Sequence, residues 1–363
     1  MGPLAGLRVV ELAGIGPGPF AGMMLADHGA ELIRIDRPGT AHEPTDPLLR
    51  SRRSVVLDLK DDEDRRCLRA LVREADGLIE GFRPGVMERL GLGPHVLLAD
   101  NPRLVYGRMT GWGQDGPLAQ AAGHDINYTA LVGTLAALGR AGDKPTPPIN
   151  LVGDFGGGGM LLAFGMLAAM LAVKAGKPGQ VVDCAMTDGS ALLMSMMWGF
   201  RAAGRWSDQR GQNLLDTGAP FYDTYETADG EFVAVGAIEP QFYLDFRRGL
   251  ELSDDPALDP QFEQAQWPEQ KRMLADAIRQ RSRAEWVERF KTLDGCFTPV
   301  LSFDEAVAHP HNRARGTFIE VGGVVQPAPA PRYSETPCAL PSAPPEPGRD
   351  QALVAPPGAA TAA

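Results

Sequence analysis

The stretch that decides the fold is residues 7–36, LRVVELAGIGPGPFAGMMLADHGAELIRID. It opens with a strand pattern at Leu7–Leu12, continues with a helical pattern at Phe20–His28 and ends with a second strand pattern at Glu31–Ile35. A strand, a crossover helix and a second strand are the repeating unit of a parallel sheet. We therefore expect the N-terminal part of the chain to be an α/β domain.

The same alternation continues along the next 70 or so residues. Further strands are expected at Ser54–Leu59, Gly77–Glu80 and Leu104–Met109, with an amphipathic helix at Asp61–Ala75. This pattern predicts a mostly parallel sheet with helices on both faces. Two long apolar helices are expected at 160–175 and 188–203.

The character of the chain changes after about residue 205. Thr224–Gly236 predicts a β-hairpin with Asp229-Gly230 as its turn, and Trp267–Leu293 predicts a helical stretch. We expect a smaller α+β domain at 205–320 and a large domain made of 1–204 and 321–363. The proline-rich segment 325–347 is expected to run extended along a surface.

Composition restricts the classes of function. The chain has 363 residues and a net charge of −11, which argues against nucleic acid as a partner. Its four cysteines are scattered without a CxxC pair, which is typical of reduced thiols. The longest apolar run, Met160–Val173, is shorter than the ~20 residues of a membrane span and favours a core helix. With no signal peptide apparent, we expect a cytoplasmic protein without a membrane partner.

The glycine loop Gly14–Pro19 raises the possibility of a dinucleotide site, with Asp36 at the end of the second strand. The GxGxxG pattern fails because its third glycine position holds Pro19. Prolines at 17 and 19 also remove backbone N–H donors that a pyrophosphate requires. A tight turn with proline at the start of a helix is the favoured interpretation.

Basic side chains follow several of the expected strands. In an open α/β sheet, ligands bind outside the carboxyl ends of the strands, where such side chains could hold a phosphate. The alternative is that each is solvated or paired at the surface. The residues in question are Arg34, Arg37, Arg52, Arg53, Lys60, Arg83 and Arg89.

Two segments carry candidate acid–base groups. His124 lies beside Asp125, and Asp154 precedes the four glycines Gly156–Gly159 at the start of an apolar helix. Free N–H groups at such a helix start could stabilise an oxyanion. The alternative is that Asp154 caps the helix, which would lower its pKa, whereas a catalytic acid needs a raised pKa.

Several motifs together resemble family III CoA transferases, and within that family the α-methylacyl-CoA racemase branch. The resemblance covers about residues 3–335. It rests on LAGIGPGPF, IDRPG, GFRPGVMERLGLGP, MTGWGQDGP, GHDINY, LVGDFGGG, DGS and VAVGAIEPQFY.

The resemblance implies a large CoA-binding domain with a Rossmann-like sheet, a small domain, and an interlocked homodimer with shared active sites. It implies that His124 and Asp154 are the catalytic bases and that Glu239 of the other chain partners the histidine. The implied CoA-binding residues are Arg37, Leu57, Asp58, Leu59, Lys60, Gly81, Phe82, Arg83, Arg89, Gly123, Asp125, Ile126, Asn127 and Tyr128.

The implied reaction interconverts the R and S forms of 2-methylacyl-CoA thioesters by two-base proton transfer through an enolate. Inversion needs a base on one face of the carbon and an acid on the other, which a His and an Asp can supply. Donors near Gly156–Gly159 are expected to bind the enolate oxygen. No metal or other cofactor is expected, because coenzyme A is part of the substrate.

Three further interpretations stay open. In a CoA transferase of the same family, Asp154 would be a nucleophile. A CoA-binding protein without catalysis would not need His124 and Asp154. In the racemase branch the acyl tail is thought to slide over a methionine-rich surface, for which the candidates are Met186, Met194, Met196 and Met197, unless these methionines pack in an ordinary helix core.

Overall fold

The computed structural model describes residues 2–354 and contains two compact units. The larger unit comprises Met1–Val132, Ile149–Met194 and Arg313–Ala363, and the smaller comprises Gly133–Pro148 and Ser195–Asn312. The expected boundaries lay at 204/205 and 320/321. In the structure, 133–148 and 195–204 contact the smaller unit and 313–320 contacts the larger unit, because these segments connect the two units.

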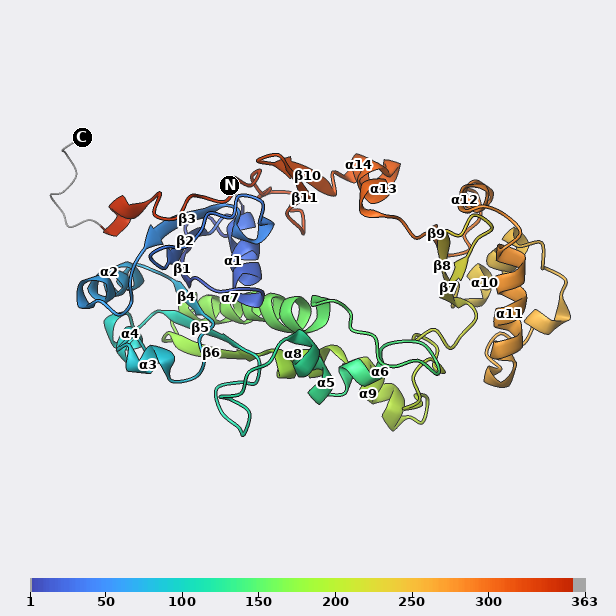
Figure 1. The fold of residues 1–363 in the computed structure, drawn as a ribbon, viewed down its shortest axis with the longest axis horizontal. Helices are drawn as coiled ribbons and strands as arrows, with labels where there is room; N and C mark the ends of the chain where they lie inside the picture. Colours follow the sequence, from blue (N-terminus) through green and yellow to red (C-terminus); the bar gives the residue numbers. More distant parts are fainter. Residues whose placement is uncertain (1, 355–363) are drawn as a thin grey trace. The chain divides into compact units, whose positions relative to one another are not determined.

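The larger unit is built on a six-stranded parallel sheet (Figure 1). The strand order is β3-β2-β1-β4-β5-β6, which confirms the parallel α/β prediction. The strand bounds are β1 Arg8–Leu12, β2 Glu31–Asp36, β3 Arg52–Val56, β4 Gly77–Glu80, β5 Val105–Thr110 and β6 Gln180–Ala185. The sequence analysis did not predict β6, whose first four residues are mostly exposed at the sheet edge and therefore carry no buried-strand pattern.

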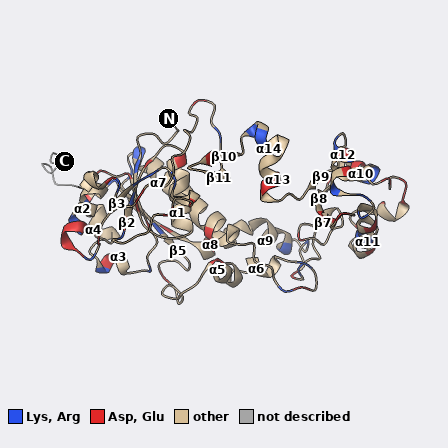
Figure 2. Ribbon diagram, turned by 45° about the horizontal axis from the view of Figure 1, so that its top comes forward, with Lys and Arg blue, Asp and Glu red and all other residues tan. Residues whose placement is uncertain are grey.

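Helices cover both faces of this sheet (Figure 1). On one face α1 (Pro17–Asp27) and α7 (Leu161–Lys174) bury Leu25 and Met166 against the strands. On the other face α2 (Asp62–Arg73) and α4 (Pro94–Asp100) bury Leu68 and Leu97. The acidic, exposed first turn of α2 stands out in Figure 2, as expected for an amphipathic helix with Asp61 as its cap.

Charged groups are buried between the first three strands. Glu11 of β1 is fully buried and contacts Arg34 at 2.9 Å and Arg52 at 2.8 Å. Arg34 also contacts Asp36 at 2.9 Å. Arg34 and Arg52 are therefore neutralised inside the domain, and their expected availability to a phosphate is wrong. The strand β3 begins at Arg52, two residues before the predicted start at Ser54, because a buried arginine does not belong to the apolar pattern used for the prediction.

The expected glycine-rich turn before the apolar helix is instead helical. Residues Leu151–Met160 form the π-helix η2, which continues directly into α7. Gly157, Gly158 and Gly159 are buried against α1 and α8 (Met186–Leu193), where a Cβ atom would lie 3.0 Å or less from neighbouring atoms. These glycines therefore permit close helix packing.

The combined helix Leu151–Lys174 is long and apolar enough, by length and composition alone, to cross a membrane. Half of its most apolar window is buried inside the protein, where it packs on β5, β6 and α1. That packing is what a core helix of an α/β domain shows.

The apolar stretch 188–203 is not one helix as expected. The chain forms α8 and then α9 (Ser195–Ala202), with Met194 between them, and the division into two units falls at this break. The remaining elements of the larger unit are η1 Pro47–Leu49, α3 Val86–Arg89, α5 Asp125–Leu131, β10 Phe318–Val321, β11 Val324–Pro327 and η5 Gln351–Val354.

The C-terminal segment packs against the outer edge of β3. Ser51 N–H donates to the Ser342 carbonyl, Asp350 N–H donates to the Ser54 carbonyl, and Gln351 bonds both the N–H and the carbonyl of Val56. Ser342 belongs to the segment 325–347 that was expected to run along a surface, and Asp350 and Gln351 follow it; together they pair the edge of the sheet, which would otherwise offer unpaired backbone groups.

The smaller unit contains the predicted hairpin, with strands β7 (Tyr222–Glu226) and β8 (Phe232–Gly236), and β9 (Phe297–Pro299) pairs with β8. Gly230 has a φ of 77°, as the hairpin turn requires. An aromatic core including Phe221, Phe246 and Trp286 lies between sheet and helices. Its helices are α6 Thr134–Ala137, α10 Pro240–Gly249, η3 Pro256–Leu258, η4 Gln264–Gln266, α11 Trp267–Ile278, α12 Arg283–Phe290 and α13 Phe303–Ala308, and α14 (Pro310–Arg315) leads back to the larger unit.

Candidate active site

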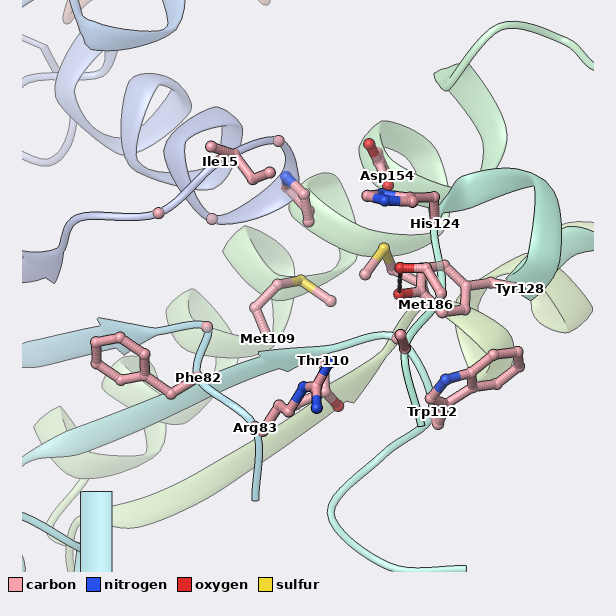
Figure 3. A pocket seen from close by; sticks show the side chains of 18 of the residues that line it. Ile15, Phe82, Arg83, Met109, Thr110, Trp112, His124, Tyr128, Asp154 and Met186 are labelled. Atoms are coloured by element: carbon pink, nitrogen blue, oxygen red, sulfur yellow. Dashed lines mark hydrogen bonds between the residues drawn. The ribbon is translucent and has the colours of Figure 1, made fainter. Parts of the chain in front are cut away.

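A pocket of about 940 Å³ opens at the carboxyl ends of the parallel strands of the larger unit (Figure 3). Its walls come from the segments after β1, β2, β4, β5 and β6, around the point where the strand order reverses between β1 and β4. Open α/β sheets bind ligands at this place. The lining includes Ala13, Gly14, Ile15, Gly16, Pro17, Arg37, Gly81, Phe82, Arg83, Met109, Thr110, Trp112, Gly123, His124, Asn127, Tyr128, Asn150, Asp154 and Met186.

His124 lies at the start of α5, on the pocket wall. Its backbone N–H donates to Asn127 Oδ1 at 3.0 Å, and the Asn127 N–H donates back to the His124 carbonyl at 2.8 Å. Tyr128 donates from its hydroxyl to the Gly123 carbonyl and packs edge-on against Trp112. The backbone that carries the imidazole is thus fixed from both sides, while the side chain is exposed to the pocket.

Asp154 lies in the first half of η2, beside His124 (Figure 3). Its carboxylate accepts a hydrogen bond from Asn150 Nδ2 at 3.2 Å. Partial burial raises the pKa of Asp154, the negative charge of Asp125 raises it further, and the Asn150 hydrogen bond and His124 act in the opposite direction. The net direction is upward, as a carboxyl that exchanges protons near neutral pH requires.

The question of whether Asp154 caps a helix is settled by these contacts. Asn150 precedes the first residue of η2, and Asp154 is a helical residue whose side chain makes no capping bond in the described chain. The pKa-lowering effect of a cap is therefore absent.

The glycine run does not supply the expected oxyanion donors. In a π-helix each N–H bonds the carbonyl five residues earlier, so the amides of Gly156–Gly159 are used inside η2. First-turn amides of a helix have no such partner. Those of α5, at Asp125 and Ile126, directly follow His124 in the chain.

The glycine loop after β1 is part of the pocket. Pro17 is the first residue of α1, as expected for a structural turn, but Gly14, Ile15 and Gly16 line the cavity. Gly16 has a φ of 69°, and a Cβ atom there would lie 3.2 Å from Asp154 Oδ2. The sequence analysis assigned no functional residue to this loop. The close approach of Gly16 to Asp154 is a tertiary contact that the sequence does not show.

Of the fourteen implied CoA-binding residues, seven line the pocket and seven do not. Arg37, Gly81, Phe82, Arg83, Gly123, Asn127 and Tyr128 line it together with His124's loop. The Leu57–Lys60 segment follows β3 at the same sheet edge but outside this pocket, with Leu57 in the core. Arg89 is exposed in α3, Ile126 is exposed on α5, and Asp125 is buried beneath the wall.

Glu239 lies in the smaller unit, exposed, directly before α10. Its pairing with His124 of another chain stays a prediction.

Several lining residues were not singled out from the sequence. Met109, Thr110 and Trp112 follow β5, where the carboxyl-end rule could have found them, and Asn150 is the hydrogen-bond donor to Asp154. Of the methionine candidates only Met186 lines the pocket, where it is joined by Met109; Met194, Met196 and Met197 are not part of the lining.

Residues 2–354 contain no group of three or more His, Cys, Asp or Glu side chains arranged to hold a metal ion.

Comparisons with known proteins agree with this architecture. The chain is 51% identical over 341 residues to an α-methylacyl-CoA racemase of Mus musculus, covering 94% of this chain and 88% of the relative. It is 49% identical to the racemase of Homo sapiens, covering 93% and 88%.

A crystal structure of a CAIB/BAIF family protein from Brucella suis superposes with a TM-score of 0.83 at 26% identity, covering 97% of this chain and 98% of that one. The model of CoA-transferase family III matches residues 4–351. With that match over nearly its whole length and relatives at half identity, the chain belongs to CoA-transferase family III.

Proposed function

We propose that the protein racemises 2-methylacyl-CoA thioesters. The observation that carries this proposal is the placement of His124 beside Asp154 in one pocket, with the pKa of Asp154 raised, in a chain half identical to α-methylacyl-CoA racemases. Two proton-transfer groups of different type are what a two-base inversion requires.

The α-carbon of the thioester would lie between the two groups. One removes the α-proton to give an enolate, and the other returns a proton to the opposite face, so that one group gains a proton and the other loses one. The raised pKa of Asp154 narrows the gap between its proton affinity and that of an imidazole, which favours transfer in both directions. The first-turn amides of α5 would stabilise the enolate oxygen.

The coenzyme A moiety would lie along the strand ends. Arg37 and Arg83 are exposed on the pocket wall, where charge-assisted bonds to phosphates are available. Leu57–Lys60 and Arg89 would extend the same site beyond the cavity. The acyl tail would contact Met109 and Met186, whose flexible thioethers suit an apolar chain that moves. No further cofactor is needed for this reaction.

The homodimer with shared active sites is also proposed, with Glu239 of one chain beside His124 of the other. It is supported by large exposed apolar side chains on η2, α7 and α8 of the larger unit. These are Leu151 (57% exposed), Phe164 (69%), Leu171 (69%), Leu192 (59%) and Leu193 (52%). Large apolar side chains this exposed are expected to be covered, and the covering proposed is a second copy of the chain in the cytoplasm, with no membrane involved.

The alternative is a CoA transferase in which Asp154 attacks the thioester carbonyl as a nucleophile. Membership of the family favours this reading, and Asp154 lines the pocket beside Gly16, which carries no side chain. The exchange experiment separates the two.

The test is incubation of one enantiomer of a 2-methylacyl-CoA with the protein in D₂O, without an acceptor acid. Replacement of the α-proton by deuterium together with appearance of the other enantiomer is expected. If no exchange occurs and an added free carboxylic acid takes up CoA instead, the transferase is the correct function.

A further inference from the structure

The side chain of Asp125 lies behind the pocket wall. It is 5% exposed, and its Oδ2 accepts a hydrogen bond from the backbone N–H of Asp154 at 2.8 Å. Asp125 is the first residue of α5, directly after His124, and Asp154 lies in η2. This bond therefore ties α5 to the helix that carries Asp154. The residue that follows one proposed base, His124, thus binds the backbone amide of the other, Asp154.

The other oxygen of this carboxylate is unusual. Asp125 Oδ1 is buried and has no hydrogen-bond partner in the described chain. A buried carboxylate oxygen without a donor is costly, and among residues 2–354 no arginine or lysine forms an ion pair with this group. Such a group persists in a fold when its charge or position serves the site.

Gly153 makes room for the contact. A Cβ atom at this position would lie 2.4 Å from Asp125 Oδ2 and 3.2 Å from the Asp125 Cα. Glycine therefore lets the carboxylate approach the η2 backbone closely enough to bond the next amide. The Gly153-Asp154 pair and Asp125 form one packed arrangement, although 29 residues separate the bonded groups in sequence.

We propose that Asp125 is a positioning residue for the proposed racemisation, which holds the backbone of Asp154 in place and keeps a negative charge beneath its carboxyl group. This proposal rests on the proposed function. It also assigns Asp125 a different role from the CoA contact that the family resemblance implies, because the side chain faces Asp154 and not the cavity.

The electrostatics of the site agree with this geometry. The negative charge of Asp125 raises the pKa of Asp154, and His124 and Asn150 oppose it. Tyr128 of α5 is the remaining ionisable group near Asp154 on that helix, and its own pKa is raised by burial and by Asp154. The facing part of α1 offers Gly16, Pro17 and Phe20, which do not ionise, and Asp188 of α8 is exposed.

The principal test is Asp125→Asn, which keeps the shape of the side chain and removes its charge. The limb of the pH profile of kcat/KM that belongs to Asp154 is expected to move to lower pH by about one unit. The kcat is expected to fall about 10-fold, with KM within about threefold of wild type, because the substrate contacts remain. Asp115→Asn, which removes a charge from an exposed loop, is the matched control and should leave all three quantities unchanged.

A second variant tests the positioning without touching the carboxylate. Gly153→Ala should displace Asp125 and lower kcat about 10- to 100-fold. Gly199→Ala is its control, since a Cβ atom there meets nothing within 4 Å. Circular dichroism and the melting temperature of each variant report whether the fold is kept.

The protonation of Asp154 can also be measured without substrate. The ¹³C resonance of the Asp154 carboxyl, identified by its loss in Asp154→Asn, should titrate at lower pH in Asp125→Asn than in wild type. Equal midpoints together with unchanged kcat would overturn the role of Asp125. If the wild-type protein shows no α-proton exchange, the proposed function is wrong, whereas the carbon titration still decides whether Asp125 acts on Asp154.

Discussion

Two regions of the larger unit treat their carboxylates in opposite ways. Between β1, β2 and β3, Glu11 is fully buried and contacts two arginines. At the pocket, Asp125 and Asp154 lie close to one another, and their hydrogen bonds come from an amide N–H and an asparagine. Glu11 is neutralised by arginine, whereas Asp125 and Asp154 have no arginine or lysine partner among the described residues and the pKa of Asp154 is raised.

The largest effect is expected from removing the proposed bases themselves. Asp154→Ala and His124→Ala should each lower the rate of racemisation at least about 10³-fold, since inversion needs both proton-transfer groups. The measurement is the appearance of the opposite enantiomer from each pure enantiomer, with the melting temperature as a control for folding. Racemisation at the wild-type rate in either variant would remove that residue from the mechanism.

Breaking the paired region should cost stability. Glu11→Ala leaves Arg34 and Arg52 buried without their shared partner, and we expect unfolding to become about 3–5 kcal/mol easier. Denaturant titration measures this difference. A loss below about 1 kcal/mol would mean that the arginines find other partners and that the two regions differ less in how they stabilise their carboxylates.

A smaller and opposite shift is expected from Asn150→Ala. Its hydrogen bond stabilises the ionised form of Asp154, so its removal should raise the pKa of Asp154 and move the corresponding limb of kcat/KM to higher pH. Since Asp125→Asn moves the same limb to lower pH, the two variants bracket the wild-type profile. Movement of both in the same direction would contradict the assigned electrostatics.

The smallest effect is expected at an exposed ion pair. Arg248 contacts Asp245 at 2.7 Å within α10, where both groups are hydrated. Arg248→Ala should change the free energy of unfolding by less than about 0.5 kcal/mol in the same denaturant assay used for Glu11→Ala. A loss comparable to that of Glu11→Ala would show that burial is not what separates the two kinds of pair.

Much of the scaffold could be predicted because its signals are local. The first five strands of the sheet and the hairpin β7–β8 follow from apolar patterns and turn residues, and β4 was placed at its observed bounds. The rule that ligands bind at strand carboxyl ends singled out Arg37 and Arg83, which line the pocket, and Lys60, which does not. The strand β6 and the break at Met194 were missed, because an exposed edge strand and a helix interruption leave no such pattern.

Only part of the candidate site could be predicted from the sequence. His124 and Asp154 were found through motifs and chemistry, and both line one cavity. The arginines of β2 and β3 were misjudged, since a sequence does not show that Glu11 will neutralise them inside the domain. The glycine run Gly156–Gly159 was interpreted as a turn with free amides, whereas these amides donate hydrogen bonds within η2.

The class of fold, the strand edge at which the pocket opens and the candidate acid and base could be predicted from the chain alone, because periodicity, strand ends and motifs are local features of a sequence. The tertiary structure alone decided which charges are neutralised and which remain. Arg52 pairs with Glu11 across 41 residues, and Asp125 binds the amide of Asp154 across 29. Burial and charge pairing depend on such distant contacts, and they set the proton affinity on which the proposed chemistry rests.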